Sequence, residues 1–175
     1  MRYRYLIHAL SIFILFVFDF VIQAVFNVAH IRPFFFVSQL HFIGLVLYAR
    51  EDSRFEILTK VLAVSFIMEL FHYKSYPVYY ISYGLSILVV RFWHRHISDS
   101  YLEKLLMVSL AIFMKETLLF YLLKIFEHIN LSYFMFLSNR SIWIILFSSL
   151  LLPLALWVYN FSEKQVRSYA HQHYQ

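Results

Sequence analysis

The side chains of this chain that could do chemistry are polar groups placed inside long apolar runs. Asp19, Glu69 and the adjacent pair Lys115 and Glu116 each fall about 14 residues into such a run, and Gln23 lies one helical turn after Asp19. A charge at the centre of a bilayer costs about 2.5–3.5 kcal/mol on insertion scales, so these groups normally face protein or water. The five residues are therefore a candidate intramembrane polar layer, or a partner or ligand site.

Two explanations of this layer stay open. If the helices carrying Asp19, Glu69 and Glu116 run in one direction, the groups share a depth of roughly 21 Å from the helix starts. They could then act as hydrogen-bonded joints between helices, each worth about 0.6 kcal/mol, or as a binding or partner-docking site. Glu69 could also be solvated at its helix end. Lys60 is expected to pair with Glu56, one turn earlier on the same helix.

Other chemical motifs are weaker. Glu69-x-x-His72 is similar to the Glu-x-x-His of di-iron bundles, but such a site needs a second copy, which the sequence lacks. With no Cys and only two Gly, thiolate chemistry and phosphate-cradling loops are excluded. We predict no enzyme activity, no metal and no cofactor. The remaining histidine pairs are expected to be solvated: His94, His96, His171 and His173.

The composition indicates which class of protein holds these polar groups in place. The chain has 175 residues, of which 62% are hydrophobic and 14% charged. A soluble domain has about 25% charged residues, so soluble, disordered and disulfide-stapled classes are excluded. An integral membrane protein remains. Its net charge of +5 needs no nucleic acid, since basic residues beside the bilayer face anionic lipid.

The apolar runs predict an all-α, polytopic bundle. A helix needs about 20 mostly apolar residues to cross the hydrocarbon, and the runs are too long and continuous for a β-barrel. The first run keeps Asp19 and lacks a signal-peptidase site, so it is expected to be retained. We predict one membrane domain, 1–175, with six transmembrane helices at 5–26, 33–49, 55–71, 76–92, 101–125 and 141–161.

Lys and Arg set the expected orientation. They concentrate at the ends and in alternate loops, which places both termini in the cytoplasm. Two predicted cytoplasmic basic loops could contact an acidic partner or lipid, although a role in topology is the simpler explanation. Their residues are Arg50, Arg54, Arg91 and Arg95.

The middle of the chain resembles the bacterial rod shape-determining protein MreD family. Arg32-Pro33, followed by Gly44-Leu-Val-Leu-Tyr-Ala-Arg50-Glu51, is similar to that family's Pro-x-Leu run ending in a charged loop. Phe66-Ile-Met-Glu69-Leu-Phe71 resembles its acidic residue followed by Leu-Phe, and the segment 75–83 resembles its Ser-Pro-Leu-Gly segment. The chain departs from the family at 72–74, where His-Tyr-Lys replaces glycines.

The resemblance implies a non-enzymatic scaffold of the cell-elongation machinery in the bacterial plasma membrane. It implies binding to the single-span protein MreC, and through MreC to RodA and a class B penicillin-binding protein. Where the actin-like MreB exists, contacts to it are also implied. The alternative is a substrate-binding subunit of an energy-coupling vitamin importer, with the acidic layer as its pocket. Against it, the Ala-x-x-x-Ala docking pattern of such subunits does not occur.

Overall fold

The computed structural model describes residues 2–28, 39–71, 77–93, 100–126 and 130–173, and the regular structure in these ranges is helical. The prediction of an all-α chain is confirmed for them. The elements are α1 (Arg2–Val28), α2 (Leu40–Tyr48), α3 (Arg54–Phe71), α4 (Val78–Trp93), α5 (Tyr101–Ile125), α6 (Tyr133–Phe136), the π-helical turn η2 (Leu137–Ser141) and α7 (Ile142–His173).

Three helical stretches of the described chain are long and apolar enough to cross a membrane: Tyr3–Val25, Tyr101–Ile125 and Tyr133–Tyr169. Membrane-type helices are thus confirmed. Nine residues of α2 span only about 13.5 Å, and four charged residues interrupt the 18 residues of α3. The number of spans and the side on which the termini lie stay predictions.

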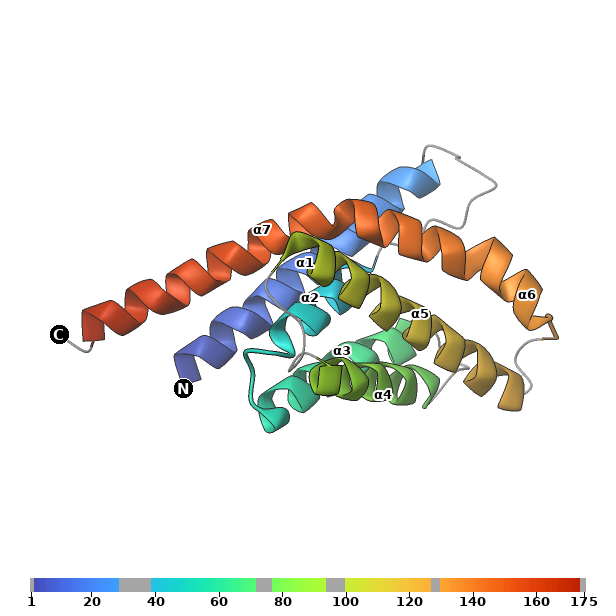
Figure 1. Cartoon of the computed structure of the whole chain (residues 1–175), viewed down its shortest axis with the longest axis horizontal. Coiled ribbons are helices and arrows are strands. Elements are labelled where there is room, and N and C mark those ends of the chain that lie inside the picture. The colour runs from blue at the N-terminus through green and yellow to red at the C-terminus, as the bar shows by residue number, and fades with distance from the viewer. Residues whose placement is uncertain (1, 29–38, 72–76, 94–99, 127–129, 174–175) are drawn as a thin grey trace.

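Helix α2 lies at the centre of the bundle, and all nine of its residues are buried. Helices α1 and α7 pack on one side of it, whereas α3 and α4 lie together on the other side and α5 crosses between them (Figure 1). Because α2 is apolar apart from His41 and is buried on every face, it has no lipid-facing or water-facing stripe, as expected of a helix enclosed by others. The short α2 therefore joins the longer helices into one core.

Close packing of α1 on α2 depends on Gly44. A Cβ at this position would lie 2.7 Å from Cδ1 of Leu15, a side chain that is fully buried. Contacts this short do not persist without displacement of an atom, so a small residue is needed where these helices meet. Gly84 on α4 has no such neighbour within 4 Å.

Several helix ends differ from their predicted positions. Helix α1 starts at Arg2 and α7 continues to His173, twelve residues past the predicted end of the last apolar run. The rings of Tyr3 and Tyr169 stack with their centroids 3.8 Å apart, so the two helices pair beyond their apolar parts. Helix α1 starts and α7 ends at the same end of the bundle (Figure 1). The predicted start of the second helix, residues 33–38, lies outside the described residues.

Candidate functional site

Asp19 of α1 caps the N-terminus of α2. The backbone N–H groups of Leu40 and His41 donate to its two carboxylate oxygens, each at 2.9 Å. Gln39, the residue in the N-cap position of α2, makes no capping bond with its own side chain. The first N–H groups of a helix have no partner within that helix, so an acceptor from elsewhere must satisfy them. A carboxylate is especially favourable there because it also opposes the positive end of the helix dipole.

The same carboxylate begins a chain of buried polar contacts. Nδ1 of His41 bonds Asp19, and Nε2 of His41 lies 2.8 Å from the Tyr83 hydroxyl on α4. Carboxylate, imidazole and hydroxyl follow one another as they do in hydrolytic triads. Tyr83, however, is only 1% exposed, so its hydroxyl is closed to a substrate in this conformation. As described, the chain of contacts fixes α1, α2 and α4 to one another.

Lys115 and Glu116 of α5 meet Gln39 at the same end of α2. Nζ of Lys115 lies 2.7 Å from Oε1 of Glu116 and donates to the Gln39 side chain, whose amide nitrogen donates to Glu116 at 2.9 Å. Arg140 supplies Nε to the second Glu116 oxygen at 3.1 Å. Glu116 is fully buried, and both of its oxygens are hydrogen-bonded. We call these residues the central polar cluster: Asp19, Gln39, His41, Tyr83, Lys115, Glu116 and Arg140.

Arg140 reaches Glu116 from the π-helical turn η2. A π-turn inserts an extra residue into a helix and rotates the side chains that follow it. The Arg140 guanidinium also lies 5.7 Å from the centre of the Phe136 ring. With Asp19, Glu116, Lys115 and Arg140 ionised, the formal charges of the cluster cancel, as burial in a membrane requires.

Glu69 gives α4 the cap that Asp19 gives α2. Its Oε1 accepts the backbone N–H of Tyr79 at 2.8 Å and that of Tyr80 at 3.3 Å. Glu69 is 6% exposed, so the alternative that it is solvated at its helix end is wrong. Helices α2 and α4 therefore each receive their cap from a carboxylate on the preceding helix.

The five predicted layer residues thus divide among separate contacts. Lys115 and Glu116 form a direct ion pair, whereas Asp19 and Glu69 each bond the start of a different helix. Gln23 is half-buried on α1, and no hydrogen bond joins it to the other four among the described residues. The polar layer also contains Gln39, His41 and Arg140, which were not among the predicted layer residues. His41 also interrupts an apolar run, once a neutral imidazole is counted as polar.

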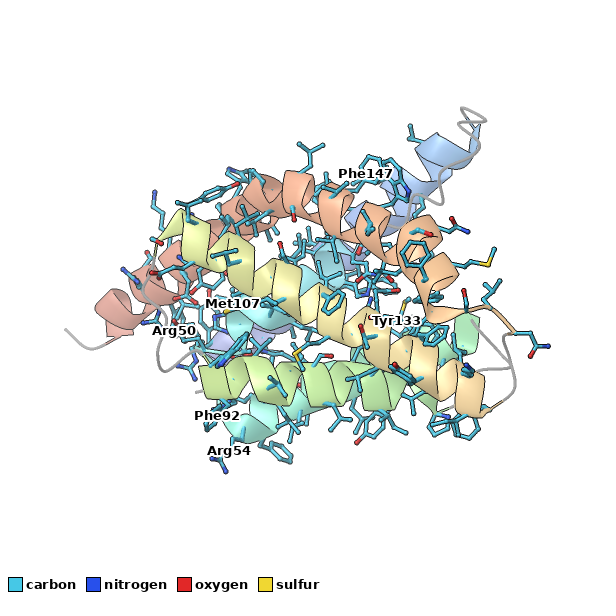
Figure 2. The ribbon with its side chains drawn as sticks, turned by 45° about the vertical axis from the view of Figure 1, so that its right-hand side comes forward. Arg50, Arg54, Phe92, Met107, Tyr133 and Phe147 are labelled. Carbon is cyan, nitrogen blue, oxygen red and sulfur yellow. The ribbon has the colours of Figure 1, made fainter. Side chains whose placement is uncertain are left out.

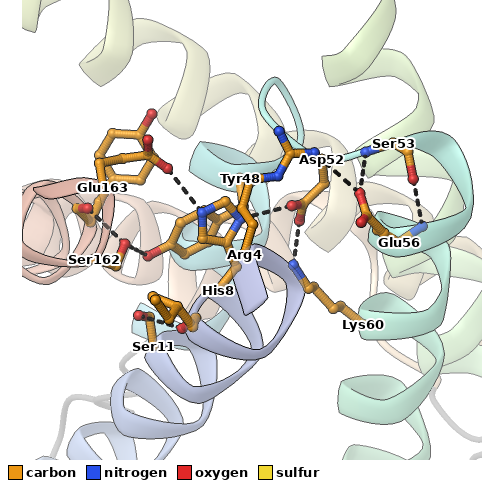
Figure 3. Close-up of polar contacts among 12 residues, drawn as sticks. Arg4, His8, Ser11, Tyr48, Asp52, Ser53, Glu56, Lys60, Ser162 and Glu163 are labelled. Atoms are coloured by element: carbon orange, nitrogen blue, oxygen red, sulfur yellow. Dashed lines mark hydrogen bonds and ion pairs between the residues drawn. The ribbon is translucent and has the colours of Figure 1, made fainter. Parts of the chain in front are cut away.

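A second set of polar groups, buried except for the partly exposed Glu163, lies between α1, the α2–α3 connection and α7, and we call it the terminal polar cluster: His8, Tyr48, Asp52, Lys60, Ser162 and Glu163. His8 is fully buried, with Nδ1 2.8 Å from Asp52 and Nε2 2.9 Å from Glu163 of α7 (Figure 3). The Tyr48 hydroxyl lies 2.5 Å from Ser162 Oγ. The cluster therefore ties α1, the α2–α3 connection and α7 together.

Lys60 also belongs to this cluster, and its predicted pairing is wrong. Its Nζ bonds Asp52 at 2.5 Å instead of Glu56. Glu56 is used by a capping box at the start of α3, in which its carboxylate accepts the Ser53 backbone N–H at 2.8 Å. Arg4 lies 3.4 Å from the same Glu56 carboxylate (Figure 3).

Asp52 accepts bonds from two basic groups at once. Burial alone would raise the pKa of its carboxyl, but hydrogen bonds from His8 and Lys60 outweigh burial and hold this pKa below its usual value. Arg91 of α4 donates to the Asp52 backbone carbonyl at 2.9 Å. The connection between α2 and α3 is thus fixed from three helices.

The predicted basic loops lie at this same end. Arg50 and Arg54 are exposed and lie on the same side of the view as Phe92 (Figure 2), and Arg91 is half-buried on Asp52. Arg95 lies outside the described residues, as do His72, His94 and His96. Within the ranges that the structure describes, no group of three His, Asp or Glu side chains could hold a metal ion.

Comparison with known proteins gives no relative: no protein-family model, no curated protein and no solved structure matches this chain.

Proposed function

We propose that this chain is a non-enzymatic scaffold of the bacterial cell-elongation machinery, embedded in the plasma membrane and resembling MreD. In this proposal it binds an MreC-like single-span protein. Through that partner it acts with RodA, a class B penicillin-binding protein and, where it exists, MreB. The observation that carries the proposal is that the buried carboxylates bind other groups of the bundle itself. Asp19, Glu69 and Glu116 cap helices and pair with cations, so they serve the architecture of the bundle.

A protein of this shape can act mainly through its exposed helix faces and short connections. On α1, for example, Leu6, Leu10 and Phe13 are about 60% exposed and lie on one face. Such apolar faces suit lipid or a transmembrane helix of another protein, which packs through van der Waals contacts. Partner docking therefore fits this chain better than chemistry on a small substrate.

The proposed topology has six spans with both termini in the cytoplasm. The contacts of His8 support it, because they join the start of α1 to Asp52, after α2, and to Glu163, in the last third of α7. These three places lie at one end of the bundle. The chain must therefore return to that end after α1, even though α2 alone is too short to cross a bilayer.

The test is affinity purification of the intact chain in mild detergent, with mass spectrometry of proteins and small molecules. We expect a single-span coiled-coil protein together with wall synthases. Recovery of ATPase subunits or a retained vitamin would replace the scaffold with the importer alternative.

A variant separates the two outcomes further. Glu116→Gln changes the one carboxylate that contacts Lys115, Gln39 and Arg140. If the cluster binds a ligand, this variant loses that ligand while the fold persists. Under the scaffold proposal it lowers stability, and partner recovery falls only in proportion to the folded fraction. Glu51→Gln, at the other end of α2, is the matched control.

A further inference from the structure

The contacts of His8 indicate a protonated ring. A neutral imidazole carries no charge, whereas an imidazolium is positively charged and attracts carboxylates at both of its nitrogens. In this structure Nδ1 lies 2.8 Å from Asp52 and Nε2 lies 2.9 Å from Glu163. A neutral ring would place no positive charge beside the Glu163 carboxylate.

The contact with Glu163 is purely an ion pair. Nε2 of His8 and Oε1 of Glu163 have no hydrogen-bond partner within the described residues, although only 2.9 Å separates them. Their attraction therefore depends on opposite charges. His8 is fully buried and Glu163 is partly exposed, so water screens this pair only on the α7 side.

Charged and titratable groups surround His8 on the elements packed against it. They are Asp52 in the α2–α3 connection, Lys60 on α3, Tyr48 on α2, Glu163 on α7 and Arg91 of α4, which donates to the Asp52 backbone carbonyl, with the Arg4–Glu56 pair beyond them. Lys60 and Arg91 both contact Asp52, whereas Glu163 contacts His8. A proton on His8 therefore places a positive charge beside the Glu163 carboxylate.

We propose that His8 is a proton-binding site that fastens α7 to the rest of the bundle. With the proton bound, the imidazolium holds Glu163 on one side and Asp52 on the other. When the proton is lost, the attraction between the His8 ring and Glu163 is lost with it, and the end of α7 beyond Ser162 separates from α1. Among the described residues, the stack of Tyr3 on Tyr169 also joins α1 to this part of α7. This end of the protein would then respond to pH.

Spin labels can measure this separation, because the chain has no Cys of its own. Labels on Arg54→Cys and Arg167→Cys, both exposed, report the distance between α3 and α7. We expect a narrow distance distribution at about pH 6 and a broader one at about pH 10, on either side of the range in which histidine titrates.

Glu163→Gln separates the effect of the His8 proton on this distance from the effects of other titrating groups, Lys60 included. The amide that this change introduces can donate to a neutral His8, so the distribution should stay narrow at both pH values. Glu51→Gln, a carboxylate at the same end without a contact to His8, should behave as the parent protein. A pH response that persists in Glu163→Gln, or no response in the parent, overturns the proposal.

A measurement on the unaltered side chains covers the case in which Glu163→Gln fails to fold. Nitrogen NMR of the ¹⁵N-histidine-labelled protein at about pH 6, with His8→Gln to assign the signal, reports the protonation of both ring nitrogens. Two protonated nitrogens on His8 are expected. A neutral ring would contradict the assignment.

Discussion

Asp19 lies on α1, and its carboxylate caps the N-terminus of α2. Its two oxygens take the N–H groups of Leu40 and His41, a role that a Ser, Thr, Asp or Asn directly before a helix usually has. Within a membrane no water can replace such an acceptor, so these N–H groups would be left without a partner if the carboxylate were removed. A residue 21 positions away in the chain thus determines whether α2 can begin where it does.

We therefore expect Asp19→Asn to destabilise the bundle by about 2 kcal/mol, the combined scale of a lost cap and a lost charged hydrogen bond. The measurement is the free energy of unfolding in mixed detergent micelles. Gln23→Ala is the control, since Gln23 lies one turn away on α1 and is half-buried. Equal effects of the two changes would show that the cap does not stabilise α2.

Asp52 provides a prediction on the acid side. Its pKa in the folded protein lies below that of a free Asp, about 3.9, so the ionised carboxylate stabilises the fold above that value. This contribution is lost as the pH falls through the folded-state pKa. Thermal stability in detergent should therefore drop on acidification below about pH 4. In Asp52→Asn the drop should be smaller and the stability at neutral pH lower; parallel pH profiles would exclude Asp52 as the cause.

The residues of the polar clusters were only partly predictable from the sequence. Lys115 and Glu116 stand out because they interrupt an apolar run. His8 and His41 interrupt such runs too, but a count of formal charges does not single them out, because it treats histidine as neutral. The partner of Lys60 could have been suspected, because Ser53-Arg-Phe-Glu56 has the spacing of a capping box and this occupies Glu56. That Asp52 is the partner depends on the path of the α2–α3 connection, which spacing alone does not determine.

Among the helices, α2 shows the limit of predictions from hydropathy. The run at 33–49 has the apolar character of a transmembrane helix, but hydropathy cannot tell lipid from a protein core. In the structure α2 is enclosed by α1, α3, α4, α5 and α7. Likewise, the end of α7 could not be located from apolar residues, because its last turns are polar and are stabilised by α1 through Tyr3 and Tyr169.

The packing of α1 on α2 can be tested with the two glycines of the chain. Gly84→Ala should stabilise α4 by up to about 1 kcal/mol, since alanine favours helix and space is open around that position. Gly44→Ala should lose this gain, because its Cβ meets Leu15, and Gly44→Val should cost about 1–3 kcal/mol from overpacking.

A double-mutant cycle identifies Leu15 as the residue responsible. The cost of Gly44→Val should be smaller in a Leu15→Ala background, because the shortened side chain removes the atom that the new Cβ would meet. Unfolding free energies of the four proteins give this coupling directly. An unchanged cost would mean that another neighbour of Gly44 resists the larger side chain.

At the scale of the whole molecule, the two polar clusters restrict how the chain can cross a membrane. The terminal polar cluster requires His8, Asp52 and Glu163 to lie at one end, whereas the three longest apolar stretches alone would place His8 and Asp52 on opposite sides of the bilayer. Single cysteines distinguish the two arrangements, because the chain has none of its own. The positions are a cysteine added before Met1, Ser53→Cys in the α2–α3 connection, and Asn130→Cys before α6.

With six spans, a membrane-impermeant thiol reagent applied to whole cells should label only Asn130→Cys. The other two positions should react after the cells are opened. Three spans would instead separate the added N-terminal cysteine from Ser53→Cys, so that one of them reacts in intact cells and the other does not. That result would also be incompatible with the contact of His8 with Asp52, on which the proton-binding proposal depends.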